Sequence, residues 1–203
     1  MPRSRFDELA AIAQEHDGLL TSKEARDAGI TDSVLARLTQ RGRLERVARG
    51  VYRLPYFSPD RLSQYREVIL WAKANRGPEA AALSHLTALA LYGISDANPD
   101  SIHLTVPKQA RLRRQIPRGV VIHRQDLAPG DIAMEEDLPV TTVGRTVADL
   151  LQSGGRINLI QQAVRDARRG GLITDAESRR LLRQAEAHLR ALRENRQRET
   201  QNV

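Results

Sequence analysis

Arginine is the residue that most clearly marks a place for chemistry in this sequence. Between positions 37 and 53 there are six arginines and a single acid, Glu45. A guanidinium group binds phosphate oxygens as a cation, and it can bind the edge of guanine through two hydrogen bonds. Such a stretch indicates a nucleic-acid contact where the fold presents the arginines on one surface, and an ordinary solvated hairpin where it does not. The elements around the arginines decide between these two interpretations.

Three short helices and a hairpin are predicted around this stretch. Apolar residues at helical spacing predict a helix over 5–16. Thr21 and Glu24 have the spacing of a capping box, which predicts the start of a second helix. A third helix is predicted over 31–40, and a two-stranded wing over 43–54. This order of elements is typical of a winged helix-turn-helix, whose third helix fits the major groove of DNA.

Side-chain chemistry suggests how such a module divides its contacts. We expect Arg37 and Gln40 on the outer face of the third helix, where they distinguish guanine from adenine. Thr31 and Ser33, at the start of that helix, are suited to phosphate. We expect the wing, with Arg49 at or near its tip, to hold the DNA backbone. The predicted DNA-binding residues are Thr31, Ser33, Arg37, Gln40, Arg41, Arg43, Arg46, Arg49 and Arg53.

The bulk composition agrees with a polyanionic partner. The formal net charge is +7, and neutralising phosphates with basic side chains releases counterions. Aromatic residues make up only 3% of the chain, which disfavours binding by base stacking. There is no cysteine, no secretion signal and no apolar stretch long enough for a membrane span. We therefore expect a cytoplasmic protein.

The remainder of the chain predicts a second domain. We expect a winged helix-turn-helix domain at 1–56, an α+β domain at 57–195, and a polar tail at 196–203 that is frayed or disordered. Strands are predicted at 102–106 and 120–123. The predicted fold class is mixed α/β, with helices dominating.

The segment between those two strands forms a second basic stretch. It is free of acids, and a loop between two strands would present its basic side chains together. They would contact flanking DNA or an RNA, or they would simply be solvated; the sequence leaves both open. The candidate residues for this second contact are Lys108, Arg111, Arg113, Arg114 and Arg118, with Arg124 close behind them.

No catalytic, metal or cofactor site is predicted. The chain has five histidines, and they are scattered along it without ligand spacing on any one helix. Ser84 and His85 fall on a predicted helix over 80–92, where neighbouring side chains point apart. The glycine pairs at 154–155 and 170–171 are read as helix ends, not as phosphate loops. We therefore expect no enzymatic activity.

Four segments together resemble one known family. The sequence resembles the AbiEi antitoxins of type IV toxin-antitoxin systems, including the mycobacterial members, over most of residues 6–170. The hairpin motif is moderately specific, and the occurrence of all the motifs in this order is more so. The segments that carry the resemblance are 44–55 (LERVARGVYRLP), 83–89 (LSHLTAL), 102–107 (IHLTVP) and 138–150 (LPVTTVGRTVADL).

The resemblance implies two activities. Such proteins bind inverted repeats upstream of their own operon through the winged helix, and they counter a nucleotidyltransferase-type toxin, in many cases without a stable complex. Repeat binding suggests two protomers on one site. Two alternatives stay open: a transcription regulator whose second domain senses a small molecule, and an antitoxin that acts by direct contact with the toxin or with tRNA.

Overall fold

The chain is described by a computed structural model that covers residues 4–74, 81–112 and 115–201. It divides into two compact units. The first contains Met1–Ala81 and Val106–Val120, and the second contains Ala82–Thr105 and Val121–Val203. Within the described residues, no helix is both long and apolar enough to cross a membrane.

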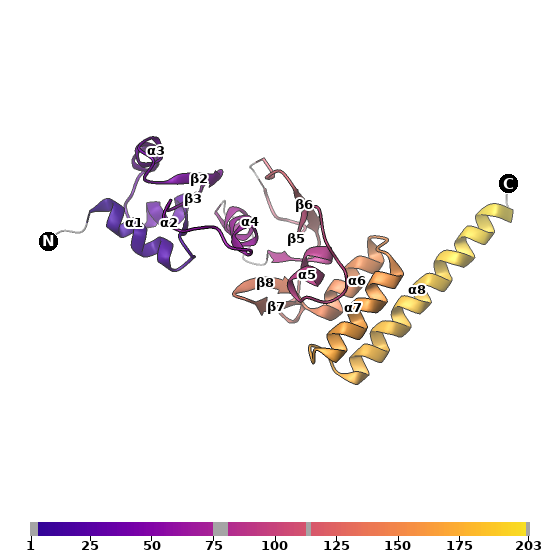
Figure 1. Ribbon diagram of the computed structural model, residues 1–203. Helices are drawn as coiled ribbons and strands as arrows, with labels where there is room; N and C mark the ends of the chain where they lie inside the picture. Colours follow the sequence, from indigo (N-terminus) through magenta and orange to yellow (C-terminus); the bar gives the residue numbers. More distant parts are fainter. Residues whose placement is uncertain (1–3, 75–80, 113–114, 202–203) are drawn as a thin grey trace. The chain divides into compact units, whose positions relative to one another are not determined.

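The first unit is a three-stranded antiparallel sheet surrounded by short helices (Figure 1). Its strands are ordered β1-β3-β2, and a core that includes Leu9, Leu35 and Leu54 lies between sheet and helices. The Thr21 hydroxyl oxygen accepts a hydrogen bond from the Glu24 backbone N–H, and the Thr21 backbone N–H donates one to the Glu24 carboxylate; this is the predicted capping box. The elements are α1 (Arg5–Gln14), β1 (Leu19–Thr21), α2 (Ser22–Asp27), α3 (Asp32–Gln40), β2 (Glu45–Ala48), β3 (Val51–Arg53) and α4 (Ser63–Lys73).

The second unit combines a five-stranded mixed sheet with the helices α5 to α8. The strand order is β6-β5-β4-β8-β7, and the β4–β8 pair is parallel. Helices α6, α7 and α8 pack together around Val147, Ile160 and Leu181. The elements are β4 (Ala82–Leu83), α5 (His85–Leu91), β5 (Ile102–Val106), β6 (Val120–Arg124), a 3-10 turn (Pro129–Asp131), β7 (Ile132–Glu135), β8 (Leu138–Thr141), α6 (Val143–Gln152), α7 (Ile157–Arg169) and α8 (Asp175–Gln201).

The predicted fold class, a helix-dominated mixed α/β chain with a winged helix-turn-helix first, is confirmed. Two local predictions are wrong. The predicted helix over 80–92 begins as strand β4, because Ala82 and Leu83 pair with neighbouring strands in a buried position that suits any small or apolar residue. The predicted disordered tail is largely helical, because α8 continues to Gln201.

Candidate nucleic-acid interface

Helix α3 presents one polar face to solvent. Its buried residues, Val34 and Leu35, pack into the core of the first unit. Residues three and four apart share a helix face, so the exposed side chains of Ser33, Arg37 and Gln40 form one row along the outside. Arg41 follows directly after the helix and is also exposed. The row and Arg41 together offer two guanidinium groups and an amide, which are the groups that bind purine edges.

The start of α3 carries hydroxyl groups and one acid. The hydroxyls of Thr31 and Ser33 lie 2.8 Å apart and form a hydrogen bond with each other. Asp32, which would repel a phosphate here, is paired with Arg26 at 2.9 Å. The predicted phosphate-binding residues Thr31 and Ser33 are thus exposed beside an acid whose charge is offset by a neighbour.

The wing is the β2–β3 hairpin, and Arg49 and Gly50 form its turn. Gly50 has a φ of +84°, a left-handed conformation that only glycine adopts without strain. The pairing shifts register between Arg46 and Ala48, which is a bulge that bends the strand. Arg46 and Arg49 are both exposed. Just before the hairpin, the guanidinium of Arg43 lies 4.0 Å from the centre of the Phe6 ring, a cation–π contact that orients it.

Arg53 is placed differently from the other predicted contacts. Its side chain is only 11% exposed; it donates a hydrogen bond to Glu67 of α4 and lies 3.6 Å from Glu45. Burial raises the pKa of Glu67, while Arg53 opposes that rise. The expectation that Arg53 contacts DNA is therefore corrected: its charge is used inside the unit, where it joins the wing to α4.

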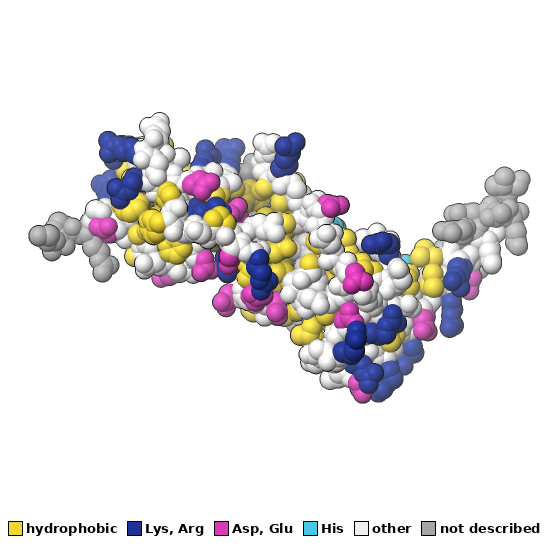
Figure 2. Space-filling view, viewed as in Figure 1, with side chains coloured by type: hydrophobic (Ala, Val, Ile, Leu, Met, Phe, Trp, Pro, Cys, Tyr) yellow, Lys and Arg dark blue, Asp and Glu magenta, His cyan; other side chains and the backbone are white. Residues whose placement is uncertain are grey.

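The basic side chains around α3 and the wing differ from those elsewhere on the surface. Figure 2 shows Lys and Arg side chains over α3 and the wing, and a second group over α7 and α8. In the second group, Arg168 and Arg169 are paired with Asp175 and Asp166. Within the described parts of the chain, no acid pairs with Arg37, Arg41 or Arg46, and these arginines are available to an external anion.

The second basic stretch joins β5 and β6, which are neighbours in the sheet. Lys108, Arg111 and Arg118 are exposed there, as predicted for a loop between strands. Arg113 and Arg114, the other two candidates, lie outside the described residues.

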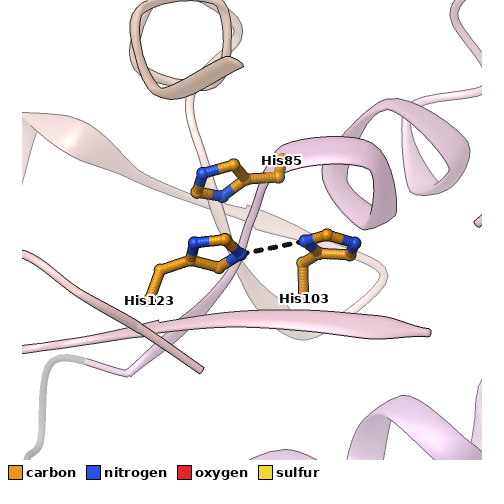
Figure 3. Close-up of side chains that lie close together, drawn as sticks. All are labelled: His85, His103 and His123. Atoms are coloured by element: carbon orange, nitrogen blue, oxygen red, sulfur yellow. Dashed lines mark hydrogen bonds between the residues drawn. The ribbon is translucent and has the colours of Figure 1, made fainter. Parts of the chain in front are cut away.

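Three histidines come together in the second unit, contrary to the prediction that the histidines are scattered. His85 at the start of α5, His103 on β5 and His123 on β6 each offer a ring nitrogen, and these nitrogens lie within 4.8 Å of one another (Figure 3). The His103 Nδ1 and His123 Nε2 atoms are 2.9 Å apart. Ligand spacing within one helix is not the relevant criterion, because His103 and His123 meet on the neighbouring strands β5 and β6, and His85 joins them from the start of α5. A signal was present in the sequence: both predicted strands of this hairpin contain a histidine.

Ser84 and His85 also differ from expectation. They lie at the junction of β4 and α5, where Ser84 is extended and His85 has a φ of +52°. The Ser84 Oγ and His85 Nδ1 atoms therefore lie 2.9 Å apart, and do not diverge as they would on a helix. Thr105 donates a second hydrogen bond to Ser84 Oγ at 2.8 Å. All three residues are buried, so Ser84 is not presented as a nucleophile.

Burial keeps the clustered histidines neutral. It lowers the pKa of His85 to about 3, with further lowering by the charges that His123 and His103 carry when protonated and by the charge of Arg145. It lowers the pKa of His123 to about 4, and lowers that of His103 as well. Neutral imidazole is the form that holds metals and accepts protons.

Comparisons with known proteins match two separate parts of the chain. Residues 7–55 match a family model described as "Transcriptional regulator, AbiEi antitoxin", and residues 80–198 match the "AbiEi antitoxin C-terminal domain". The crystal structure of the RV2827C protein from Mycobacterium tuberculosis has a similar fold, with a TM-score of 0.57 at 15% identity, over 89% of this chain and 72% of that one. A search of curated proteins gave no match. The chain belongs to the AbiEi antitoxin family: it is an antitoxin of a toxin-antitoxin system with a DNA-binding domain of the transcriptional-regulator kind.

Proposed function

We propose that this antitoxin represses its own operon by binding inverted repeats upstream of it through α3 and the wing. The observation that carries the proposal is the row of exposed Ser33, Arg37 and Gln40 on α3, beside an exposed Arg49 at the tip of the wing. A helix of this length is about 14 Å long and fits the major groove. A wing arginine can follow the backbone or enter the minor groove at the same time.

The exposed residues divide by role. Arg37 and Gln40 read base edges, because they lie in the middle and at the end of the outer row of α3. The phosphate contacts come from Thr31 and Ser33 at the start of the helix and from the basic residues after it. The proposed phosphate-binding residues are Thr31, Ser33, Arg41, Arg43, Arg46 and Arg49.

Inverted repeats call for two copies of the chain on one site. Symmetric half-sites mirror a two-fold axis between protomers, with centres about 34–36 Å apart or a multiple of that distance. We expect one chain per half-site. A domain boundary near residue 56 stays part of this proposal, although α4 also packs against the wing sheet.

Binding of the purified chain to its own upstream DNA tests the repressor function. Fluorescence anisotropy with the native duplex and a scrambled duplex, each at two salt concentrations, separates sequence readout from phosphate attraction. Arg37→Ala should weaken the native duplex by about 1–3 kcal/mol and the scrambled duplex much less. Arg49→Ala should weaken both duplexes and lower the salt slope by about one charge.

Arg183→Ala is the matched control, because it removes the same charge from an exposed position on α8. It should leave binding to both duplexes near that of the parent protein. Operator recognition would be refuted if the parent chain bound the native and scrambled duplexes equally and lost this binding at the higher salt concentration. An Arg37→Ala loss that is equal on both duplexes would refute the base-reading role of Arg37.

We further propose that the toxin it counters is of the nucleotidyltransferase type, that the second unit performs this task without itself being an enzyme, and that both tasks take place in the cytoplasm. The match of residues 80–198 to the antitoxin C-terminal domain supports a separate role for this part. Expression of residues 1–203 should restore growth of cells that produce the cognate toxin, and Arg37→Ala should restore growth equally well while losing repression. Co-purification of toxin or tRNA with the chain would instead favour neutralisation by direct contact.

A further inference from the structure

His85 carries a buried ring nitrogen that makes no hydrogen bond. The residue is 2% exposed, and among the described residues its Nε2 atom has no partner. Its other nitrogen, Nδ1, is held by Ser84 Oγ. A buried polar atom without a hydrogen-bond partner destabilises the folded state. The unpartnered nitrogen of His85 therefore needs a structural or functional reason, and two further imidazole rings lie next to this residue.

We propose that His85, His103 and His123 bind one divalent transition-metal ion of the zinc class. The three residues come from α5, β5 and β6, all within the second unit. One ring nitrogen of each residue already lies within 4.8 Å of one nitrogen of each of the other two. Imidazole nitrogen is a preferred ligand of zinc, nickel, copper and cobalt, and three such ligands leave one position for water or another donor.

The ligand atoms follow from the hydrogen bonds. For His85 we assign Nε2, which has no partner, as the ligand atom, in the tautomer whose Nδ1–H donates to Ser84 Oγ. The atoms of His103 and His123 that face each other, Nδ1 and Nε2, are the other two ligands. Metal binding replaces the hydrogen bond between them, and the ring that donates it binds the ion as its other tautomer, with the proton moved to its second nitrogen. Nitrogens at 2.0–2.1 Å from a tetrahedral ion are about 3.3 Å apart, so the present 2.9 Å must open slightly and any separation nearer the 4.8 Å limit must close.

The rings must also turn. His85 and His123 are stacked with centroids 3.5 Å apart and planes 15° from parallel, whereas ligand lone pairs must converge on one point. His123 lies on β6, the edge strand of the sheet, and is only partly buried. We therefore assign the turn to the His123 ring, because His85 is buried and held by Ser84.

The surroundings supply an outer shell and partial charge compensation. Ser84 Oγ and Thr105 Oγ1 form a hydrogen-bonded chain that fixes the His85 ring, as outer-shell groups do for metal-bound histidines. The positive charge of Arg145, which lies near His85, disfavours a bound metal cation. Its charge is offset by Asp149 and Asp131, each 2.8 Å away.

The structure thus favours a metal site over a packed histidine stack on two grounds. A stack alone leaves His85 Nε2 unsatisfied, and it gives no reason for the left-handed backbone that turns this side chain into the cluster. In the bound state the ion satisfies Nε2 and joins α5 to the β5–β6 hairpin. Binding should therefore stabilise the folded second unit.

The test uses the full chain without a polyhistidine tag, stripped with a chelator and dialysed. Calorimetric titration with Zn²⁺ should give one site per chain. Co²⁺ should give the intense visible bands of a tetrahedral site. In ¹⁵N spectra, the ring nitrogens of three histidines should shift on adding Zn²⁺, a readout that requires no mutation.

His123→Gln is the diagnostic variant, because it lies on the edge strand and is the least disruptive of the three ligands to replace. It should lower zinc affinity by at least the 10–100-fold that loss of an outer-shell group causes. His188→Gln on α8 is the control and should bind as the parent does. The proposal is overturned if the parent chain binds no zinc, or if folded His123→Gln, checked by circular dichroism, retains the parent affinity. Neither result depends on DNA binding, so this site and the repressor function are tested separately.

Discussion

Replacing Gly18 with alanine should destabilise the first unit by about 2–5 kcal/mol. Gly18 has a φ of +82°, and a left-handed conformation costs an alanine about 1–2 kcal/mol. An added Cβ would lie 2.2 Å from Cγ of Phe57, and overpacking of this kind costs about 1–3 kcal/mol more. The backbone cannot move aside easily, because Gly18 donates a hydrogen bond to Ala13 and accepts one from Leu54.

Two further variants separate these contributions. Gly29→Ala imposes a similar φ of +76° with nothing within 4 Å of the new carbon, so it should cost only the backbone part, about 1–2 kcal/mol. In a Phe57→Gly background, which removes the Phe57 Cβ at 2.4 Å together with the ring, Gly18→Ala should cost no more than Gly29→Ala does in the parent chain. The assay is urea unfolding followed by fluorescence of Trp71, the single tryptophan, which is buried on α4 and reports on the first unit. The reasoning is refuted if Gly18→Ala costs no more than Gly29→Ala, or if its cost is unchanged without the Phe57 ring.

Three other outcomes are expected. Arg53→Ala should lower the stability of the first unit by about 1–3 kcal/mol, because it leaves the Glu67 carboxylate partly buried and unpaired; a loss of DNA affinity without a loss of stability in urea would contradict this. Thr21→Ala should cost about 1 kcal/mol by the same assay, since it removes the cap of α2, and Thr21→Ser should restore most of it. Acid should destabilise the second unit in the presence of a chelator: burial holds the pKa of His85 at about 3 in the folded chain, so stability is complete above the ordinary value of 6.5 and is lost as the pH falls below it, by up to about 1.4 kcal/mol per pH unit. Circular dichroism in urea at pH 7 and pH 5 measures this loss, and His85→Phe should abolish its contribution to the slope.

The first unit was predictable because its signals are local. The capping box at Thr21 and Glu24 and the glycine in the wing turn each fix a boundary within a few residues. Strand β1 was missed because a three-residue strand in which every side chain is buried has no alternation to detect. Strand β4 was missed because its two apolar residues continue smoothly into the apolar face of α5.

The candidate sites also differ in whether local sequence signals or tertiary contacts determine them. Exposure of Arg37 and Gln40 follows from helical spacing alone, and the prediction placed them on the correct face. The partner of Arg53 was hidden, since Glu67 lies 14 residues away on a helix whose docking depends on tertiary packing. The histidine cluster was hidden for a related reason: it depends on the register of two strands joined by a long loop.

The division of the chain into units has a consequence for its synthesis. Residues 106–120 belong to the first unit, although the residues on either side of them belong to the second. Domains generally fold as units, from the N-terminus, while the chain is being made. Here the first unit lacks part of its contacts until residue 120 has left the ribosome, and by then β4 and β5 of the second unit have also emerged. We therefore expect the last steps of folding of the two units to overlap in time, and neither unit is one uninterrupted stretch that a single proteolytic cut would release.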